Sequence, residues 1–223
     1  MSVNAIEVLE DFSATARCDE GFLQIRRLRV RNRRDDGSTS PVYRVDVVDR
    51  PRLDAVAVLV VRKGASGWET LTRMNLRPAA YFRKDKAQPM PDGRSHLYCE
   101  EIVAGLLEND DSGEAGLKHR AAEEVREEAG YAVTPAEIVT LGPPFFVAPG
   151  IVSEKIFLCV VDVTGREGAV PSGDGSPLEE SPPPRWRTVE SLQAALASGE
   201  VQDAKTEIAL ARWLGLRSGL SGV

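Results

Sequence analysis

The sequence predicts an α+β fold in which helices cover a mixed β-sheet, preceded by a short antiparallel β arm. Two observations carry this prediction. Early segments alternate apolar and polar residues at period two, and a continuous apolar run, AVAVLVV at residues 55–61, has the composition of a strand buried on both faces. Helical patterns, by contrast, come late in the chain. The 223 residues suit an arm at residues 1–50 and one main domain at residues 51–218.

The arm is expected to be a hairpin with a basic face. Residues 22–30 (FLQIRRLRV) alternate apolar and basic side chains. Residues 31–40 contain the turn sequence Asp-Asp-Gly, and residues 41–48 alternate again. Two strands joined by a turn therefore precede the main core.

The main domain is expected to begin with the strand at residues 55–61 and its partner at residues 68–74. Residues 78–94 carry Pro, Lys and Asp without a period, which predicts a loop. Gly130 and Gly215 are placed to end helices, and Thr188 to cap one. The remaining strands are predicted at residues 95–104, 138–141 and 155–163, and the helices at residues 117–129, 189–197 and 203–214.

Charge and composition exclude several classes of function. A net charge of −6 and a pI near 5.2 argue against a broad electrostatic grip on nucleic acid or an anionic membrane. The apolar runs are much shorter than a membrane span, and the first residues lack the pattern of a secretory signal. Three widely spaced cysteines form no CxxC pair, which indicates reduced thiols rather than a zinc cluster. We expect a cytoplasmic protein with a small-molecule substrate.

The predicted helix at residues 117–129 carries an unusual cluster of glutamates. Glu124 and Glu128 lie one turn apart on one face, with Glu127 beside them. Like charges so placed destabilise a helix by about 0.2–0.5 kcal/mol per pair. One interpretation is a solvated acidic face on which Arg120 and Arg126 reduce the repulsion between the glutamates. The other is a site for a hard cation such as Mg²⁺, which prefers carboxylate and carbonyl oxygens.

The wider motif favours the cation site. The segments EIVAG at residues 101–105 and EVREEAGY at residues 124–131, separated by an acidic loop, resemble the Nudix box, whose pattern is a glycine, a glutamate, then Arg-Glu-apolar-x-Glu-Glu-x-Gly-apolar. Two departures stand out. Glu123 occupies the position of the arginine that orients the box glutamates, and the loop after Gly105 is longer.

The resemblance extends over residues 22–215 and points to the branch that cleaves ADP-ribose and nucleoside-diphosphate sugars. It implies a Nudix-type α/β/α sandwich and a Mg²⁺-dependent hydrolase, with Mn²⁺ as the alternative ion, that releases a nucleoside monophosphate and a sugar phosphate. It also implies a homodimer that exchanges the arm. The implied metal ligands are Glu124, Glu127, Glu128 and the Ala104 carbonyl; the implied substrate contacts are Arg77, Arg44 from the arm, and Glu154 after the Pro149-Gly150 loop.

The catalytic glutamate of that branch often lies on a late loop. Here the loop is the Gly/Pro/Ser-rich segment at residues 164–185, which is longer than a compact domain usually leaves irregular. Glu179 and Glu180 are the candidates, together with Glu127 of the box, while Glu167 and Asp174 are weaker ones. An ordinary solvated acidic loop is the competing interpretation.

Two other functions remain open at this point. One is hydrolysis of a different nucleoside diphosphate derivative, such as a dinucleotide or a nucleoside triphosphate. The other is a non-catalytic module that binds a nucleotide on a Nudix-like fold, an idea that the Glu123 departure favours and the intact Glu124, Glu127 and Glu128 oppose.

Overall fold

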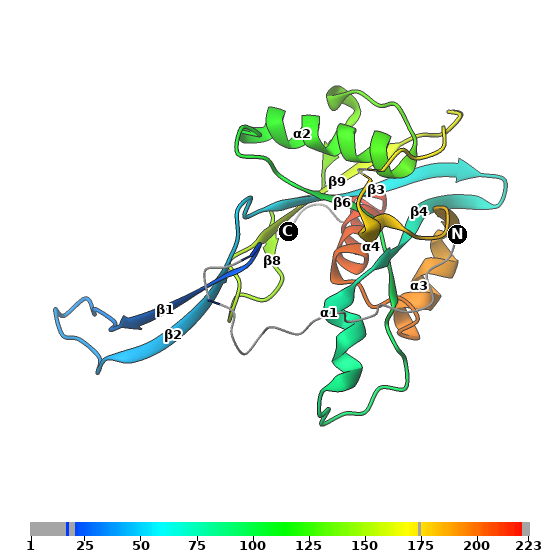
Figure 1. Cartoon of the computed structure of the whole chain (residues 1–223). Coiled ribbons are helices and arrows are strands. Elements are labelled where there is room, and N and C mark those ends of the chain that lie inside the picture. The colour runs from blue at the N-terminus through cyan, green and yellow to red at the C-terminus, as the bar shows by residue number, and fades with distance from the viewer. Residues whose placement is uncertain (1–16, 18–20, 174, 220–223) are drawn as a thin grey trace.

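The N-terminal arm is a two-stranded hairpin that extends away from the body of the protein (Figure 1). The computed structural model describes residues 17, 21–173 and 175–219. Strand β1 (Gln24–Val30) pairs antiparallel with β2 (Tyr43–Asp49), as the alternating pattern predicted. The register sets Arg29 directly opposite Arg44 on one face and Leu28 opposite Val45 on the other. One face of the arm therefore carries Arg27, Arg29 and Arg44, and the other is mainly apolar around Leu28 and Val45 but also carries Arg26.

The main sheet is mixed, as expected. Its central strand β3 (Ala55–Gly64) pairs antiparallel with β4 (Gly67–Leu76) and parallel with β9 (Lys155–Asp162). The strand order is β10-β4-β3-β9-β7, with β5 added to β4, β6 to β3 and β8 to β9. The remaining strands are β5 (Tyr98–Glu101), β6 (Val103–Leu106), β7 (Val139–Thr140), β8 (Phe145–Phe146) and β10 (Arg185–Thr188).

Helices cover both faces of this sheet because β3 is apolar on both sides. Val56, Val58 and Val60 pack against α2 (Gly113–Glu124). The alternate residues of β3, including Leu59, pack against α3 (Val189–Ala197) and α4 (Ala204–Arg217). Figure 1 shows α2 on one side of the sheet and α3 and α4 on the other. The result is the α/β/α sandwich that the sequence implied.

Two predictions in the middle of the chain were wrong in part. The loop expected at residues 78–94 is present only at residues 86–94, because Pro78 opens the short helix α1 (Pro78–Tyr81), which continues as the 3₁₀ turn η1 (Phe82–Asp85). The single strand expected at residues 95–104 is two strands, β5 and β6. They separate at Ile102, whose buried N–H donates to Thr206 Oγ1 at 3.0 Å rather than to a neighbouring strand.

The helix boundaries also differ from the pattern. Helix α2 begins at Gly113, earlier than expected, and its last part is a wider π-type turn, η2 (Val125–Ala129). Gly130 ends it in the left-handed conformation (φ 76°), as predicted. Gly215 does not end α4, which continues to Arg217. Among the described residues, no helix is long and apolar enough to cross a membrane.

Candidate active site

The box glutamates line a cavity of about 470 Å³ between the end of α2, strand β6 and the residues after β4. Glu124, Glu127 and Glu128 come from the helix, whose buried residues fix its orientation on β3. The cavity is lined as well by Arg52, Asn75, Arg77, Ala104, Gly105, Leu106, Glu108, Arg120, Ser176 and Leu178. The residues that the sequence analysis grouped as metal ligands, together with Arg77, are thus brought to one place.

The box glycine lies directly against a glutamate. A Cβ added at Gly105 would overlap the carboxylate of Glu124. A side chain at residue 105 would therefore displace this carboxylate from its present position. This contact holds the Glu124 carboxylate against the strand that also carries Ala104.

The carboxylate of Glu128 is held from two directions. Its Oε2 accepts the backbone N–H of Ala104 at 3.0 Å, and its Oε1 pairs with the guanidinium of Arg73, a buried residue of β4. The N–H and C=O of one strand residue point to the same side, so the Ala104 carbonyl also faces the glutamates. This orientation fits the backbone ligand that the resemblance implied.

Arg77 enters the cavity from the end of β4 and is fixed by a buried ion-pair network. Its Nε and Nη2 donate to the two oxygens of Glu101, at 2.6 and 2.7 Å. Lys205 of α4 donates to Glu101 at 2.9 Å. Burial alone would raise the pKa of Glu101, but the hydrogen bonds from Arg77 and the charge of Lys205 lower it to about 2. The carboxylate is therefore ionised and keeps the Arg77 fork in a fixed plane.

Arg52 and Glu108 form a second ion pair on the cavity wall, which the sequence analysis missed. Arg52 Nη1 donates to Glu108 Oε1 at 2.6 Å. Arg52 lies just after the arm and has a left-handed backbone (φ 56°), a conformation that is strained for a residue with a side chain. Glu108 lies in the lengthened loop after Gly105. No periodic signal marks either residue, because both lie outside the strands and helices.

The similarity of this chain to known proteins lies in its fold. A scan against protein-family models finds no match, and a search of curated proteins finds none. Among solved structures, the chain is similar to one described as the crystal structure of an ADP compounds hydrolase, with a TM-score of 0.57 and 16% identity, over 91% of this chain and 96% of that one. The chain has the fold of that hydrolase. The α/β/α sandwich expected from the sequence is thereby confirmed.

The oxygen ligands that line the cavity are of the kind that a hard divalent ion prefers, but they are not grouped around one point. In the part of the chain that the structure describes, no three His, Cys, Asp or Glu side chains are grouped tightly enough to hold a metal by themselves. Glu127 pairs with Arg126 at 2.5 Å, and Glu128 with Arg73. Glu124, Glu127, Glu128 and Ala104 nonetheless line one cavity, and carboxylate and carbonyl oxygens are the ligands that Mg²⁺ and Mn²⁺ prefer.

The late loop reaches the cavity because it is anchored to the box. Ala169 N–H donates to the Gly130 carbonyl at 2.8 Å, and Gly173 N–H to the Glu127 carbonyl at 3.1 Å. A side chain at Gly130 would overlap Ala169, so the same glycine that ends the helix admits the loop. The loop then places Ser176 and Leu178 on the cavity wall.

The late loop also carries the glutamates that were predicted to be catalytic. Glu180 is exposed; its carbonyl accepts the Tyr98 hydroxyl at 3.3 Å, and its side chain is not among the cavity-lining groups of the described residues. The side chain of Glu179 and the whole of Asp174 lie outside the described residues. Glu167 is exposed on the same loop. A catalytic role for Glu179 or Glu180 stays a prediction.

Arg44 and Glu154 lie away from this cavity. Arg44 is on the arm, beside Arg29. Glu154 pairs with Arg50 at the base of the arm. Neither is brought to the glutamates within one chain, so their contact with substrate also stays a prediction.

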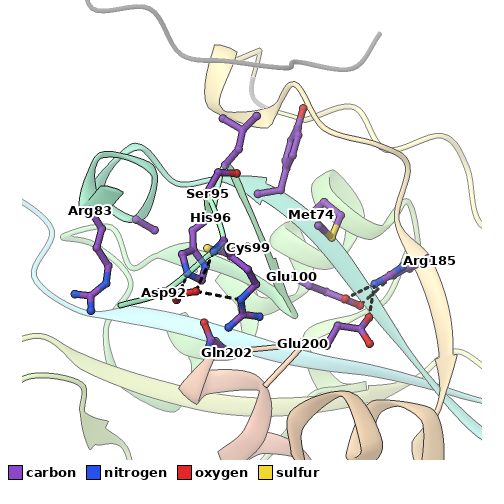
Figure 2. Close-up of a pocket in the computed structure, with 14 residues that line it drawn as sticks. Met74, Arg83, Asp92, Ser95, His96, Cys99, Glu100, Arg185, Glu200 and Gln202 are labelled. Carbon is purple, nitrogen blue, oxygen red and sulfur yellow. Dashed lines mark hydrogen bonds and ion pairs between the residues drawn. The ribbon is translucent and has the colours of Figure 1, made fainter. Parts of the chain in front are cut away.

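A larger cavity, of about 900 Å³, lies beside the strands β4 and β5 (Figure 2). Met74, Cys99 and Glu100 line it, and on its rim Asp92 is bound by His96 at 2.5 Å. Its charges are largely paired with one another, as the dashed contacts in the figure indicate. It contains none of the box glutamates.

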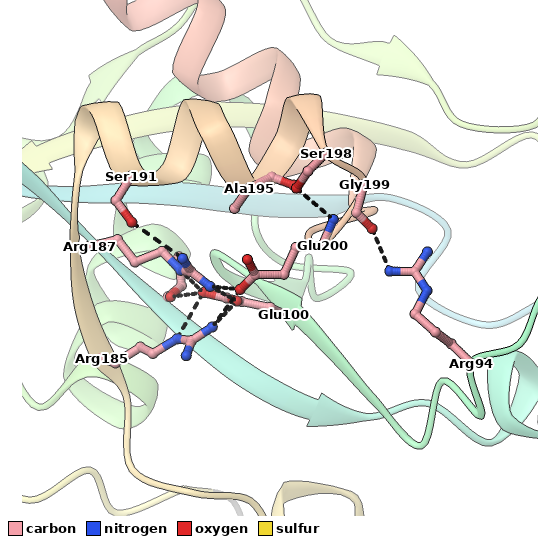
Figure 3. A network of polar contacts seen from close by, with 10 residues as sticks. Arg94, Glu100, Arg185, Arg187, Ser191, Ala195, Ser198, Gly199 and Glu200 are labelled. Atoms are coloured by element: carbon pink, nitrogen blue, oxygen red, sulfur yellow. Dashed lines mark hydrogen bonds and ion pairs between the residues drawn. The ribbon is translucent and has the colours of Figure 1, made fainter.

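Next to this cavity, a polar network fixes the strand that ends the late loop (Figure 3). Buried Glu100 accepts hydrogen bonds from Arg185 and Arg187 of β10 and from Thr72 of β4. Burial would raise the pKa of Glu100, but these donors lower it to about 2. Glu200 pairs with both arginines. The network therefore holds the far end of the loop in place.

Proposed function

We propose that this chain hydrolyses the pyrophosphate bond of a nucleoside diphosphate linked to a sugar, with ADP-ribose as the representative substrate. The products are a nucleoside monophosphate and a sugar phosphate, and the ion required is Mg²⁺ or Mn²⁺. The observation that carries the proposal is that Glu124, Glu127, Glu128 and Arg77 line one cavity. The similarity to an ADP compounds hydrolase supports it.

The residues of the cavity match the needs of the reaction. A diphosphate is strongly anionic, and on a protein of net charge −6 its charge has to be neutralised locally. Glu124, Glu127, Glu128 and the Ala104 carbonyl would hold a divalent cation, which when bound would supply that neutralisation and activate a water molecule. Arg77, held in plane by Glu101, is placed to donate to a phosphate oxygen.

The surrounding groups orient the substrate and shield the site. The guanidinium of Arg52 is a second potential phosphate donor, and its partner Glu108 keeps it on the cavity wall. Ser176 and Leu178 of the late loop cover one side and reduce the access of bulk water. Glu179 or Glu180, on the same loop, is proposed to accept the proton of the attacking water.

The proposal includes a homodimer in which the arm contacts the second subunit. A two-stranded hairpin is marginally stable in water on its own. Here Leu28 and Val45 share a face, and Tyr43 beside them is 46% exposed. A second subunit would cover this apolar face. Arg44 lies on the opposite face, so its proposed contact with the partner's substrate would involve a different surface of that subunit.

The test is turnover of a substrate panel with Mg²⁺ and with chelator. The panel contains ADP-ribose, UDP-glucose, GDP-mannose, a dinucleoside polyphosphate and the nucleoside triphosphates. Cation-dependent release of a monophosphate from one diphosphate sugar, lost in Glu128→Gln, is the expected result. Preference for a dinucleotide or triphosphate would identify the alternative hydrolase. Nucleotide binding without any turnover would identify the binding module and contradict the proposal.

A further inference from the structure

The Glu128 carboxylate is oriented by an arginine of the sheet, in a chain whose box has no arginine before its glutamates. Position 123 carries a glutamate instead. We propose that Arg73 of β4 is the positioning residue of the metal site, an inference that rests on the proposed function. It acts through Glu128, which it pairs with directly.

The strand pattern explains why Arg73 lies on the side of the sheet that carries the cavity. Side chains alternate along β4, so Arg73 and Asn75 lie on one face, and Asn75 lines the cavity together with Arg77, which follows the strand. The Arg73 side chain is 6% exposed and that of Glu128 is 13% exposed. With Ala104 N–H on its other oxygen, the Glu128 carboxylate is held by one hydrogen bond and one ion pair that come from different strands.

The arginines of the helix are committed to other partners. Arg120 bonds Asp111 at 2.9 Å and Glu123 at 3.0 Å, which joins the helix to the lengthened loop. Arg126 bonds Glu127 at 2.5 Å. Among the described contacts, the positively charged group that pairs with Glu128 is therefore the guanidinium of Arg73 on β4, and not an arginine of the helix.

Burial of an arginine at this position needs a reason. The neighbouring residues of β4, Leu71 and Thr72, are buried, and an apolar side chain at position 73 would pack there without the desolvation cost of a guanidinium. A buried cation also repels a divalent ion nearby. Its presence is explained if the fixed orientation of Glu128 matters more to the site than that repulsion.

The test measures Mn²⁺ binding without substrate, from the EPR signal of free Mn²⁺. In Arg73→Met the dissociation constant is expected to rise about 10–100-fold, the usual effect of removing a group that orients a metal ligand. Arg73→Lys keeps the charge without the planar fork and is expected to recover part of the affinity. In a Glu128→Gln background, Arg73→Met is expected to have little further effect, because its action passes through Glu128.

Arg187→Met is the matched control. The Arg187 side chain is 11% exposed and paired with a buried glutamate, Glu100, but it does not line the acidic cavity. It is expected to lower stability without changing Mn²⁺ affinity. Equal or tighter Mn²⁺ binding by Arg73→Met, or equal weakening by Arg187→Met, would overturn the role of Arg73 alone. A wild-type protein that binds no Mn²⁺ would instead remove the proposed function.

Discussion

Removing the charge of Glu101 is expected to destabilise the protein substantially at neutral pH. The wild-type carboxylate has a pKa of about 2 against an ordinary value of 4.5, because Arg77 and Lys205 favour its ionised form despite burial. Each pKa unit corresponds to about 1.4 kcal/mol, so the shift represents roughly 3 kcal/mol of stability at pH 7. Glu101→Gln should lose most of it, since the buried Lys205 then keeps only Asp203 among its described carboxylate partners.

The pH dependence of the unfolding free energy tests this reasoning. Because the folded-state pKa is lowered, the stabilisation is fully present above pH 4.5 and is lost as the pH falls toward 2. Urea unfolding followed by tryptophan fluorescence at pH 7, 5 and 3.5 should show the gap between wild type and variant narrowing at the lowest pH. Glu114→Gln, at an exposed ion pair with Lys118, is the control and should change little. A gap below about 1 kcal/mol at pH 7, or one independent of pH, would refute the reasoning.

Three further predictions follow from glycines and from the arm. Gly105→Ala should displace the Glu124 carboxylate and lower turnover at least about tenfold. Gly93→Ala is the control, because its added Cβ meets open space and should leave turnover unchanged. Equal turnover by the two variants would show that the contact between Gly105 and Glu124 does not matter for activity. Gly215→Ala, inside α4, adds a Cβ that meets no other atom within 4 Å. It should raise the unfolding free energy by about 0.5–1 kcal/mol in urea titrations, and a decrease would be inconsistent with a helical residue. Val45→Asp on the apolar arm face should give monomers by light scattering at a concentration where the wild type is dimeric; a monomeric wild type would remove the dimer.

The sequence was most informative where one local pattern decides the structure. The apolar run of β3 required burial on both faces, and the structure places helices on both. The glutamates of the box could be placed near Ala104 because one long motif contains all of them, whereas Arg77 was expected there from the wider resemblance. Thr188 was found as a helix cap from its residue type, and its hydroxyl accepts the Ser191 N–H.

Features that depend on contacts between distant segments could not be predicted. The split between β5 and β6 occurs because the Ile102 N–H bonds Thr206, about a hundred residues further along the chain. Arg73 looked like one more polar residue of a strand, and only the packing of α2 on the sheet brings it to Glu128. The Arg52–Glu108 pair joins two irregular segments that carry no periodic signal.

The central claim is metal-dependent hydrolysis at the acidic cavity, and ³¹P NMR of the reaction products tests it most directly. Wild-type protein with ADP-ribose and Mg²⁺ should convert the diphosphate resonances into those of two monophosphates. Chelator, or Glu124→Gln, should leave the diphosphate intact. Diphosphate resonances that persist with wild-type protein for every diphosphate sugar tried, or cleavage that continues unchanged in chelator and in Glu124→Gln, would contradict the account.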